Sequence, residues 1–403
     1  MKKTLAVIAA MVIGTAAVVM LGLISIQRTT PDAPSADDAD MRPRASAAGA
    51  DDAYPDFVKI TAALKVASEE REILTKLQES KTPDLAVAEP LIARNAEALA
   101  LFAVFSRRAR LTDPNYSDPD KVGPETPIPL YFPVVAAARL SSLRSGILLR
   151  QGRAPEALDE ALGVMDAGQV LLRSDQPIIS ALVGMLVTDI GARRALSVVE
   201  SGALDKARLL EAARRLSAHR GGIAALQAGL RFEYLATSNM LDNIVEHASK
   251  MPDWHWYHAL AARSRYLYQP RRTRALYAAR FRGLVEEAAK PCLQARQPSH
   301  EPVTVDAKPN TVGRVLFNYA FPNYEKLYVK RCETDFRVAA VVAAAALAAY
   351  RRDHKRWPAA LGDLVPGYVA AVPADPFTGT PLLYSAETSE IHSAGKDADG
   401  KPL

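Results

Sequence analysis

The chain has 403 residues, of which 49% are hydrophobic and 24% charged, and its formal net charge is +5. This charge is small for the length, so it does not by itself indicate nucleic acid or a membrane surface as a partner. No nucleotide-binding glycine motif, GxSxG elbow or CxxC pair occurs, so no catalytic motif supports an enzyme. Acidic and basic residues from distant parts of a chain can meet in a folded active site, so enzymatic activity stays an open question.

The N-terminal region carries an uncharged apolar run over residues 5–26, directly after two lysines. A helix needs about 20 such residues to cross a bilayer, and the lysines favour a cytoplasmic N-terminus. We predict a signal anchor over residues 1–27. It would make the protein a single-pass inner-membrane protein of bacteria, with the bulk of the chain in the periplasm. A cleaved signal peptide is the alternative, and it also exports the chain.

Residues 28–55 are rich in proline, alanine and aspartate, and large apolar side chains are almost absent. A segment of this composition cannot bury enough apolar surface to fold by itself. We therefore predict a disordered linker that lets the folded part stand away from the membrane.

Residues 56–297 follow a helical pattern, with apolar residues at 3.6-residue spacing. Helices are expected over 91–111, 130–150, 178–200, 204–219 and 222–248, and a further helix opens at Pro155. A loop rich in proline and aspartate interrupts them over 112–129. The stretch around residues 141–172 loosely resembles a tetratricopeptide hairpin without a clean repeat. The pattern predicts an irregular, α-solenoid-like helical array whose apolar stripes form helix–helix core.

The densest aromatic stretch of the sequence is residues 251–258, with Trp254, His255, Trp256 and His258. Its rings could stack on glycan or peptide, and its two histidines could share one helix face and bind a metal. However, neither an HExxH motif nor a third ligand accompanies them. We therefore favour packing of these aromatic residues against other helices.

A basic segment without acids lies at 263–282 and includes Arg271, Arg272, Arg274, Arg280 and Arg282. Such a segment with interleaved aromatics would suggest nucleic acid in a cytoplasmic protein, but export argues against that partner. Anionic lipid headgroups, cell-wall polymers or an acidic protein face are better candidates. A solvated helix face is the simplest alternative.

The only two cysteines are Cys292 and Cys332. In an oxidising compartment they can pair, which would tie the helical domain to the C-terminal end across a connecting segment at 298–330. Two unpaired buried thiols are the alternative.

Residues 331–403 read as a small α+β module. An apolar helix over 336–350 is too short to span a bilayer and suits a buried core helix. A basic turn and Trp357-Pro358 follow, then a short second helix at 361–365 and a proline-rich loop. The segments 382–384 and 390–392 are predicted to pair as a hairpin.

This order of elements resembles the periplasmic part of the major pseudopilins of type II secretion systems. The matching residues are Tyr350, Arg351, Arg356, Trp357, Pro358, Leu361, Leu364, Asp375, Pro376, Phe377, Gly379, Pro381, Tyr384, Ser393, Gly395, Asp397 and Gly400. The resemblance covers roughly the last 70 residues, but the matching helix lies deep in this chain, whereas that family has it at the N-terminus. It implies a structural, polymerising relative that is not catalytic.

The same resemblance implies a calcium-binding loop, because Asp397 and Asp399 match the start of the calcium loop of that family. Calcium takes about 6–8 oxygen ligands, so two acids form a weak calcium site, and an exposed acidic tail is favoured. No other cofactor is expected.

Together these patterns predict a mainly α protein with an N-terminal transmembrane helix, a helical array and a pseudopilin-like module. The expected function is that of a membrane-anchored periplasmic interaction or scaffold protein. Its partners would be envelope proteins, including those of a secretion or pilus-like machine, and it would contact the inner membrane through residues 5–26. The alternative is a cell-wall glycan-binding protein or envelope enzyme that uses residues 251–258.

Overall fold

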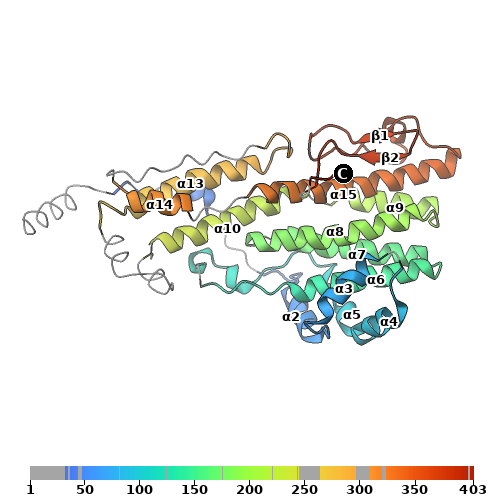
Figure 1. Cartoon of the computed structure of the whole chain (residues 1–403), viewed down its shortest axis with the longest axis horizontal. Helices are drawn as coiled ribbons and strands as arrows, with labels where there is room; N and C mark the ends of the chain where they lie inside the picture. Colours follow the sequence, from blue (N-terminus) through green and yellow to red (C-terminus); the bar gives the residue numbers. More distant parts are fainter. Residues whose placement is uncertain are drawn as a thin grey trace, which may run out of the picture.

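The computed structural model describes residues 32–34, 37–43, 48–80, 82–123, 125–174, 176–219, 221–242, 244, 264–295, 309–319, 324–397 and 400–403. Over these residues the chain is mainly helical with one two-stranded sheet, as predicted. The helices form an elongated body (Figure 1). One end of this body holds α10, α13 and α14, and the hairpin lies toward the other.

Four short helices cover one flank of the body: α2 (Tyr54–Ala63), α3 (Glu70–Glu79), α4 (Leu85–Arg94) and α5 (Ala96–Phe105). Asn95 joins α4 to α5 and is fully buried. Its amide donates to the carbonyl of Leu91 and accepts the N–H of Lys65. The loop that follows contains only the short 3-10 turns η2 (Pro114–Tyr116) and η3 (Pro119–Lys121), as its prolines predict.

The centre of the body is made of α6 (Phe132–Arg150), α7 (Ala154–Leu172) and α8 (Ile178–Glu200). Glycines let α7 and α8 approach backbone to backbone. A Cβ atom on Gly168 would lie 2.8 Å from the carbonyl oxygen of Gly184, and one on Gly191 would lie 2.9 Å from that of Ala161. Small residues at a helix crossing therefore set the spacing of the central layer.

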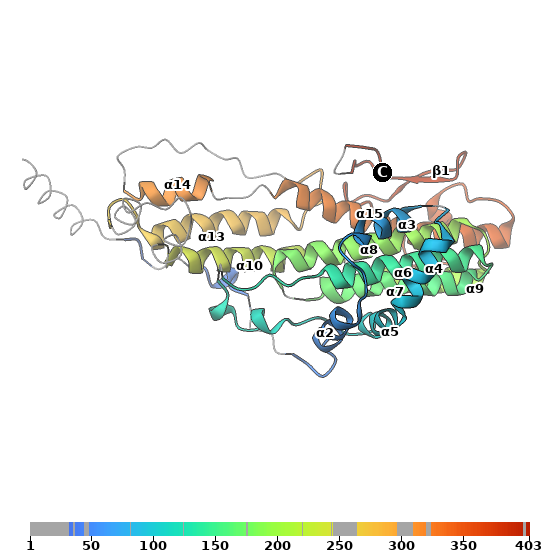
Figure 2. The ribbon, with the colours of Figure 1, turned by 60° about the horizontal axis from the view of Figure 1, so that its bottom comes forward.

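Two further helices extend this core: α9 (Lys206–Ser217) and α10 (Ile223–Asp242). Asp205 begins α9 by accepting the N–H of Arg208 at 2.9 Å, which is the role of an N-cap residue. From the side of α8, α10 runs to the far end of the body, where α13 (Pro270–Glu287) lies beside α10 and α14 (Thr311–Tyr319) lies beside α13 (Figures 1 and 2).

The longest helix is α15 (Glu325–His354), which lies along α8 and α9. It begins well before Phe336, where the apolar pattern starts, so the expected boundary between residues 330 and 331 falls inside a continuous helix. The apolar half is buried as predicted, with Val341, Ala345 and Leu347 in the core.

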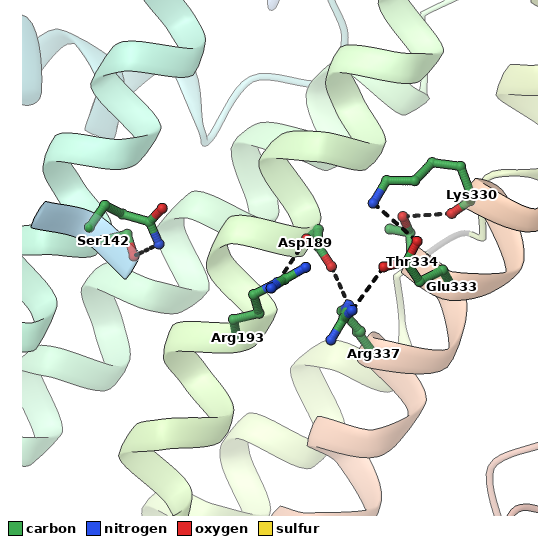
Figure 3. Close-up of polar contacts among 8 residues, drawn as sticks. Ser142, Asp189, Arg193, Lys330, Glu333, Thr334 and Arg337 are labelled. Carbon is green, nitrogen blue, oxygen red and sulfur yellow. Dashed lines mark hydrogen bonds and ion pairs between the residues drawn. The ribbon is translucent and has the colours of Figure 1, made fainter. Parts of the chain in front are cut away.

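The charged half of α15 is held to α8 by a partly buried ion network (Figure 3). Arg337 Nε lies 2.5 Å from the carboxylate of Asp189 on α8, and its Nη2 lies 2.8 Å from Glu333. Arg193 contacts the other oxygen of Asp189, and Lys330 contacts Glu333. Burial alone would raise the pKa of Glu333, but the hydrogen bond from Arg337 and the charge of Lys330 outweigh it and lower the pKa. The network joins α15 to α8 and fixes the position of α15 along α8.

After α15 come the 3-10 turn η4 (Leu361–Leu364) and the strands β1 (Leu383–Ser385) and β2 (Glu390–His392). The strands pair antiparallel with Leu383 opposite His392, which confirms the predicted hairpin. β2 contacts α15.

The described part of residues 28–55 differs from the predicted disordered linker. Met41, in the 3-10 turn η1 (Ala39–Met41), is 1% exposed and packs in the same apolar cluster as residues of α10 and α13. Asp38 accepts a hydrogen bond from the buried hydroxyl of Tyr234 at 2.5 Å. Composition predicted disorder because it reflects only the apolar surface within the segment itself. In the structure, α10 and α13 supply the apolar surface on which Met41 packs. We call the described residues 32–34 and 37–42 the acidic strap.

Candidate functional site

A groove of about 750 Å³ lies beside the C-terminal module, between β2, α15 and the end of α8. We call it the hairpin groove. Its floor is apolar and consists mainly of Leu196, Val199, Ala340, Ala344, Leu347 and Ala348. The alanines recur every four residues, so they lie on one face of α15 and keep this face low beneath the hairpin. A groove of this size and polarity suits an apolar side chain or an extended peptide segment.

The rim of the groove is basic where α15 ends. Arg352 donates to the carbonyl oxygens of Gly202 and Leu204, closing the loop after α8. Arg351 lies over the ring of Trp357, 4.7 Å from its centre, and both it and Lys355 are exposed. These two exposed cations are therefore placed to meet an anionic group at the mouth of the groove.

The other side of the groove is the outer edge of β2. Ser393, the next residue after β2, donates its N–H to the carbonyl of Leu403 at 3.0 Å. Backbone groups two residues apart on a strand point to the same side, so the N–H and C=O of Ile391 also point away from β1. The sheet has two strands over the part of the chain described, so no strand covers this edge. Ile391 and Leu403 both line the groove.

A buried carboxylate fixes the hairpin in this position. Asp375 is 1% exposed and accepts the N–H groups of Phe377 and Ala394, each at 2.9 Å. Its two oxygens also accept the hydroxyl of Ser393 at 3.0 and 3.1 Å. The Asp-Pro-Phe loop is thereby joined to the chain just after β2, two stretches that the pseudopilin resemblance had matched separately.

The predicted arginines of the basic segment do not form one free patch. Asp40 of the acidic strap forms an ion pair with Arg282 at 2.7 Å, and this guanidinium lowers the pKa of Asp40. Arg274 forms an ion pair with Asp242, and Arg280 is half-buried. Arg271 and Arg272 remain exposed at the start of α13. Acids of the chain itself thus pair with Arg274 and Arg282.

The structure describes the two predicted cysteines but not the predicted aromatic stretch. Cys292 and Cys332 form a disulfide with Cα atoms 6.3 Å apart. Residues 251–258, with Trp254, His255, Trp256 and His258, lie outside the described residues, as does Asp399.

Asp397, the other half of the calcium candidate, accepts the N–H of Lys401 at 2.8 Å within its own turn. In the described ranges no group of three or more His, Cys, Asp or Glu side chains is placed to hold a metal ion.

Sequence reasoning missed the groove. The four-residue spacing of Ala340, Ala344 and Ala348 was visible in the sequence, but helix 336–350 read as apolar all round. Only the position of the hairpin decides which face is covered.

No family model, curated protein or solved structure matches the chain. Among the described helices only α6 is long and apolar enough to cross a membrane, but 67% of its apolar window is buried inside the body, as in a core helix. The predicted anchor at 5–26 lies outside the described residues.

Proposed function

We propose that the protein is a membrane-anchored component of the bacterial envelope that binds a partner protein through the hairpin groove. The single observation that carries this proposal is the apolar groove beside the edge of β2 at Ile391, which no described strand covers. An extended segment lying along β2 would pair with the backbone of Ile391 and place alternate side chains on the alanine floor. An acidic residue in that segment would meet Arg351 and Lys355 at the rim.

The cellular location is part of the same proposal. The apolar run 5–26 supports a single-pass anchor in the inner membrane, with the helical body in the periplasm. A disulfide between the only two cysteines suits an oxidising compartment of this kind.

The narrower proposal is a partner in a secretion or pilus-like machine. It is supported by the resemblance of residues 331–403 to pseudopilins and by the contact of Asp375 with Ser393, which joins two of the matching stretches. The alternative of glycan binding or catalysis at 251–258 concerns a stretch outside the described residues.

Photo-crosslinking in living cells tests the groove directly. In one variant a photoreactive amino acid replaces Ile391. In a separate control variant it replaces Leu383 on β1, which is exposed but does not line the groove. We expect adducts from Ile391, but not from Leu383, that map to an extended segment of one envelope protein. A secretion or pilus subunit as that protein would support the narrower proposal.

Blocking the groove provides the matched comparison. Ala348→Trp places a large side chain on the floor, whereas Ala386→Trp adds the same bulk to the exposed hairpin turn. Ala348→Trp should reduce the Ile391 adduct at least tenfold, and Ala386→Trp should leave it unchanged, with equal thermal unfolding of both variants. An adduct that survives Ala348→Trp, or that forms only within the chain, would overturn the proposal.

A further inference from the structure

The start of α13 forms an exposed basic corner at one end of the body. Arg265, Arg271 and Arg272 are exposed, and none of them has an ion-pair partner among the residues that the structure describes. Leu267 lies among them in the sequence and is 36% exposed. This corner differs from the rest of α13, where Arg274 and Arg282 are neutralised by Asp242 and Asp40.

The acidic strap ties this corner to the N-terminal end of the chain. The carboxylate of Asp32 accepts the backbone N–H groups of Arg271 at 3.0 Å and Arg272 at 3.2 Å. Because it binds the backbone of the first turn of α13, both guanidinium groups stay available to another anion. Six residue steps separate Ile26, the last residue of the predicted span, from Asp32, which corresponds to roughly 20 Å of fully extended chain.

We propose that the corner formed by Arg265, Leu267, Arg271 and Arg272 rests on the anionic headgroups of the membrane. This inference rests on the proposed anchor at 5–26, whose short connection holds the corner near the bilayer surface. A basic residue is attracted to an anionic membrane within a screening length of about 10 Å. Leu267 adds an apolar contact at the headgroup level.

The consequence is an orientation for the whole body. In Figures 1 and 2, α13 and α14 lie at one end of the long body and the hairpin lies toward the other. A corner held on the membrane therefore points the hairpin groove away from the bilayer, where a periplasmic partner can reach it.

Hydrogen exchange of the full chain in lipid nanodiscs tests the contact. One set of discs contains only phosphatidylcholine and the other contains one-third phosphatidylglycerol. We expect amides of residues 264–269 to exchange at least fivefold more slowly in the anionic discs, and this protection to be lost at 0.5 M salt. The double variant Arg271→Glu, Arg272→Glu should lose it as well.

The matched control is Arg214→Glu, Arg356→Glu, which reverses two exposed arginines in or near α9 and the end of α15. It should keep the protection. Equal exchange in the two kinds of disc, or equal loss in both double variants, overturns the lipid contact while leaving the anchor intact. A chain that does not insert into either disc overturns the anchor, and the inference with it.

Discussion

Asp375 shows how one side chain fixes the geometry of the groove. Its carboxylate is buried and accepts only N–H and O–H donors, from Phe377, Ser393 and Ala394. In Asp375→Asn, one oxygen becomes an NH₂ group that must face a donor. We expect the variant to lose about 2 kcal/mol of unfolding free energy, because a buried donor is left without an acceptor. Denaturant unfolding measures this loss.

The location of the amides that lose protection distinguishes a local role of Asp375 from general destabilisation of the protein. Amides of residues 376–397 should exchange faster in Asp375→Asn, while those of α6 to α8 should keep their protection. Asp120→Asn serves as the control because that side chain is 85% exposed, and its stability should change by less than about 0.5 kcal/mol. Uniform loss of protection across the body would contradict a local role for Asp375.

Asp166 predicts a specific dependence of stability on pH. Burial would raise the pKa of this carboxyl, but the hydrogen bonds from His219 and Arg215 and the charge of Arg215 outweigh burial, so the pKa is lowered. The folded state therefore holds the carboxylate more strongly than the unfolded state does. Its contribution is complete above the ordinary pKa of 3.8 and is lost as the pH falls through the lowered value.

Acid titration of unfolding free energy checks this sign. Asp166→Asn should flatten the loss of stability below about pH 4. Asp159→Asn, on the same helix, removes an exposed pair with Arg208 and is the matched variant that loses one carboxylate. The same slope in the wild type and Asp166→Asn would show that the α7–α9 contact does not depend on this charge.

At the scale of elements, the crossing of α7 and α8 depends on small residues. A Cβ on Gly168 would lie 2.8 Å from backbone atoms of both Gly184 and Thr188, so Gly168→Ala must push the helices apart. We expect it to lower the unfolding free energy by about 2 kcal/mol through overpacking. Thermal or urea unfolding at fixed pH measures the change.

Gly163 on the same helix gives the opposite prediction. No atom lies within 4 Å of an added Cβ there, so Gly163→Ala should raise the unfolding free energy by about 0.5–1 kcal/mol through helix propensity. Opposite signs at two glycines of one helix separate packing from propensity. Stabilisation by both alanines would contradict the close α7–α8 approach.

The elements also show what the sequence could predict. Periodicity and proline placement predicted α6 to α9 within a few residues, and the proline-rich loop before residue 382 pointed to the hairpin of β1 and β2. The start of α15 was missed because residues 325–335 are charged, and their partner Asp189 lies on a helix distant in sequence. The strap and the groove were missed for the same reason. The strap and the groove both depend on the surface that a distant element presents. The sequence around Met41 or Ala348 does not indicate that surface.

At the scale of the whole molecule, the disulfide joins two parts of the core. Cys332 belongs to the cluster around α7, α8, α9 and α15, and Cys292 packs against both that cluster and the one around α10 and α13. The bond closes a loop with a sequence separation of 40 residues, which in the chain-entropy model contributes about 4 kcal/mol. The disulfide therefore holds together the part of the body that carries the basic corner and the part that carries the hairpin groove.

Reduction should lower the unfolding free energy of the wild type by about 4 kcal/mol at most, to the value of Cys292→Ser, Cys332→Ser. That double variant should not respond to reductant. The same pair reports on location, because such a bond persists in an oxidising compartment. In denatured extracts of the native host, maleimide should label neither cysteine until the sample is reduced. Complete labelling without reduction would mean that the chain resides in a reducing compartment, and this would remove the basis for a periplasmic body.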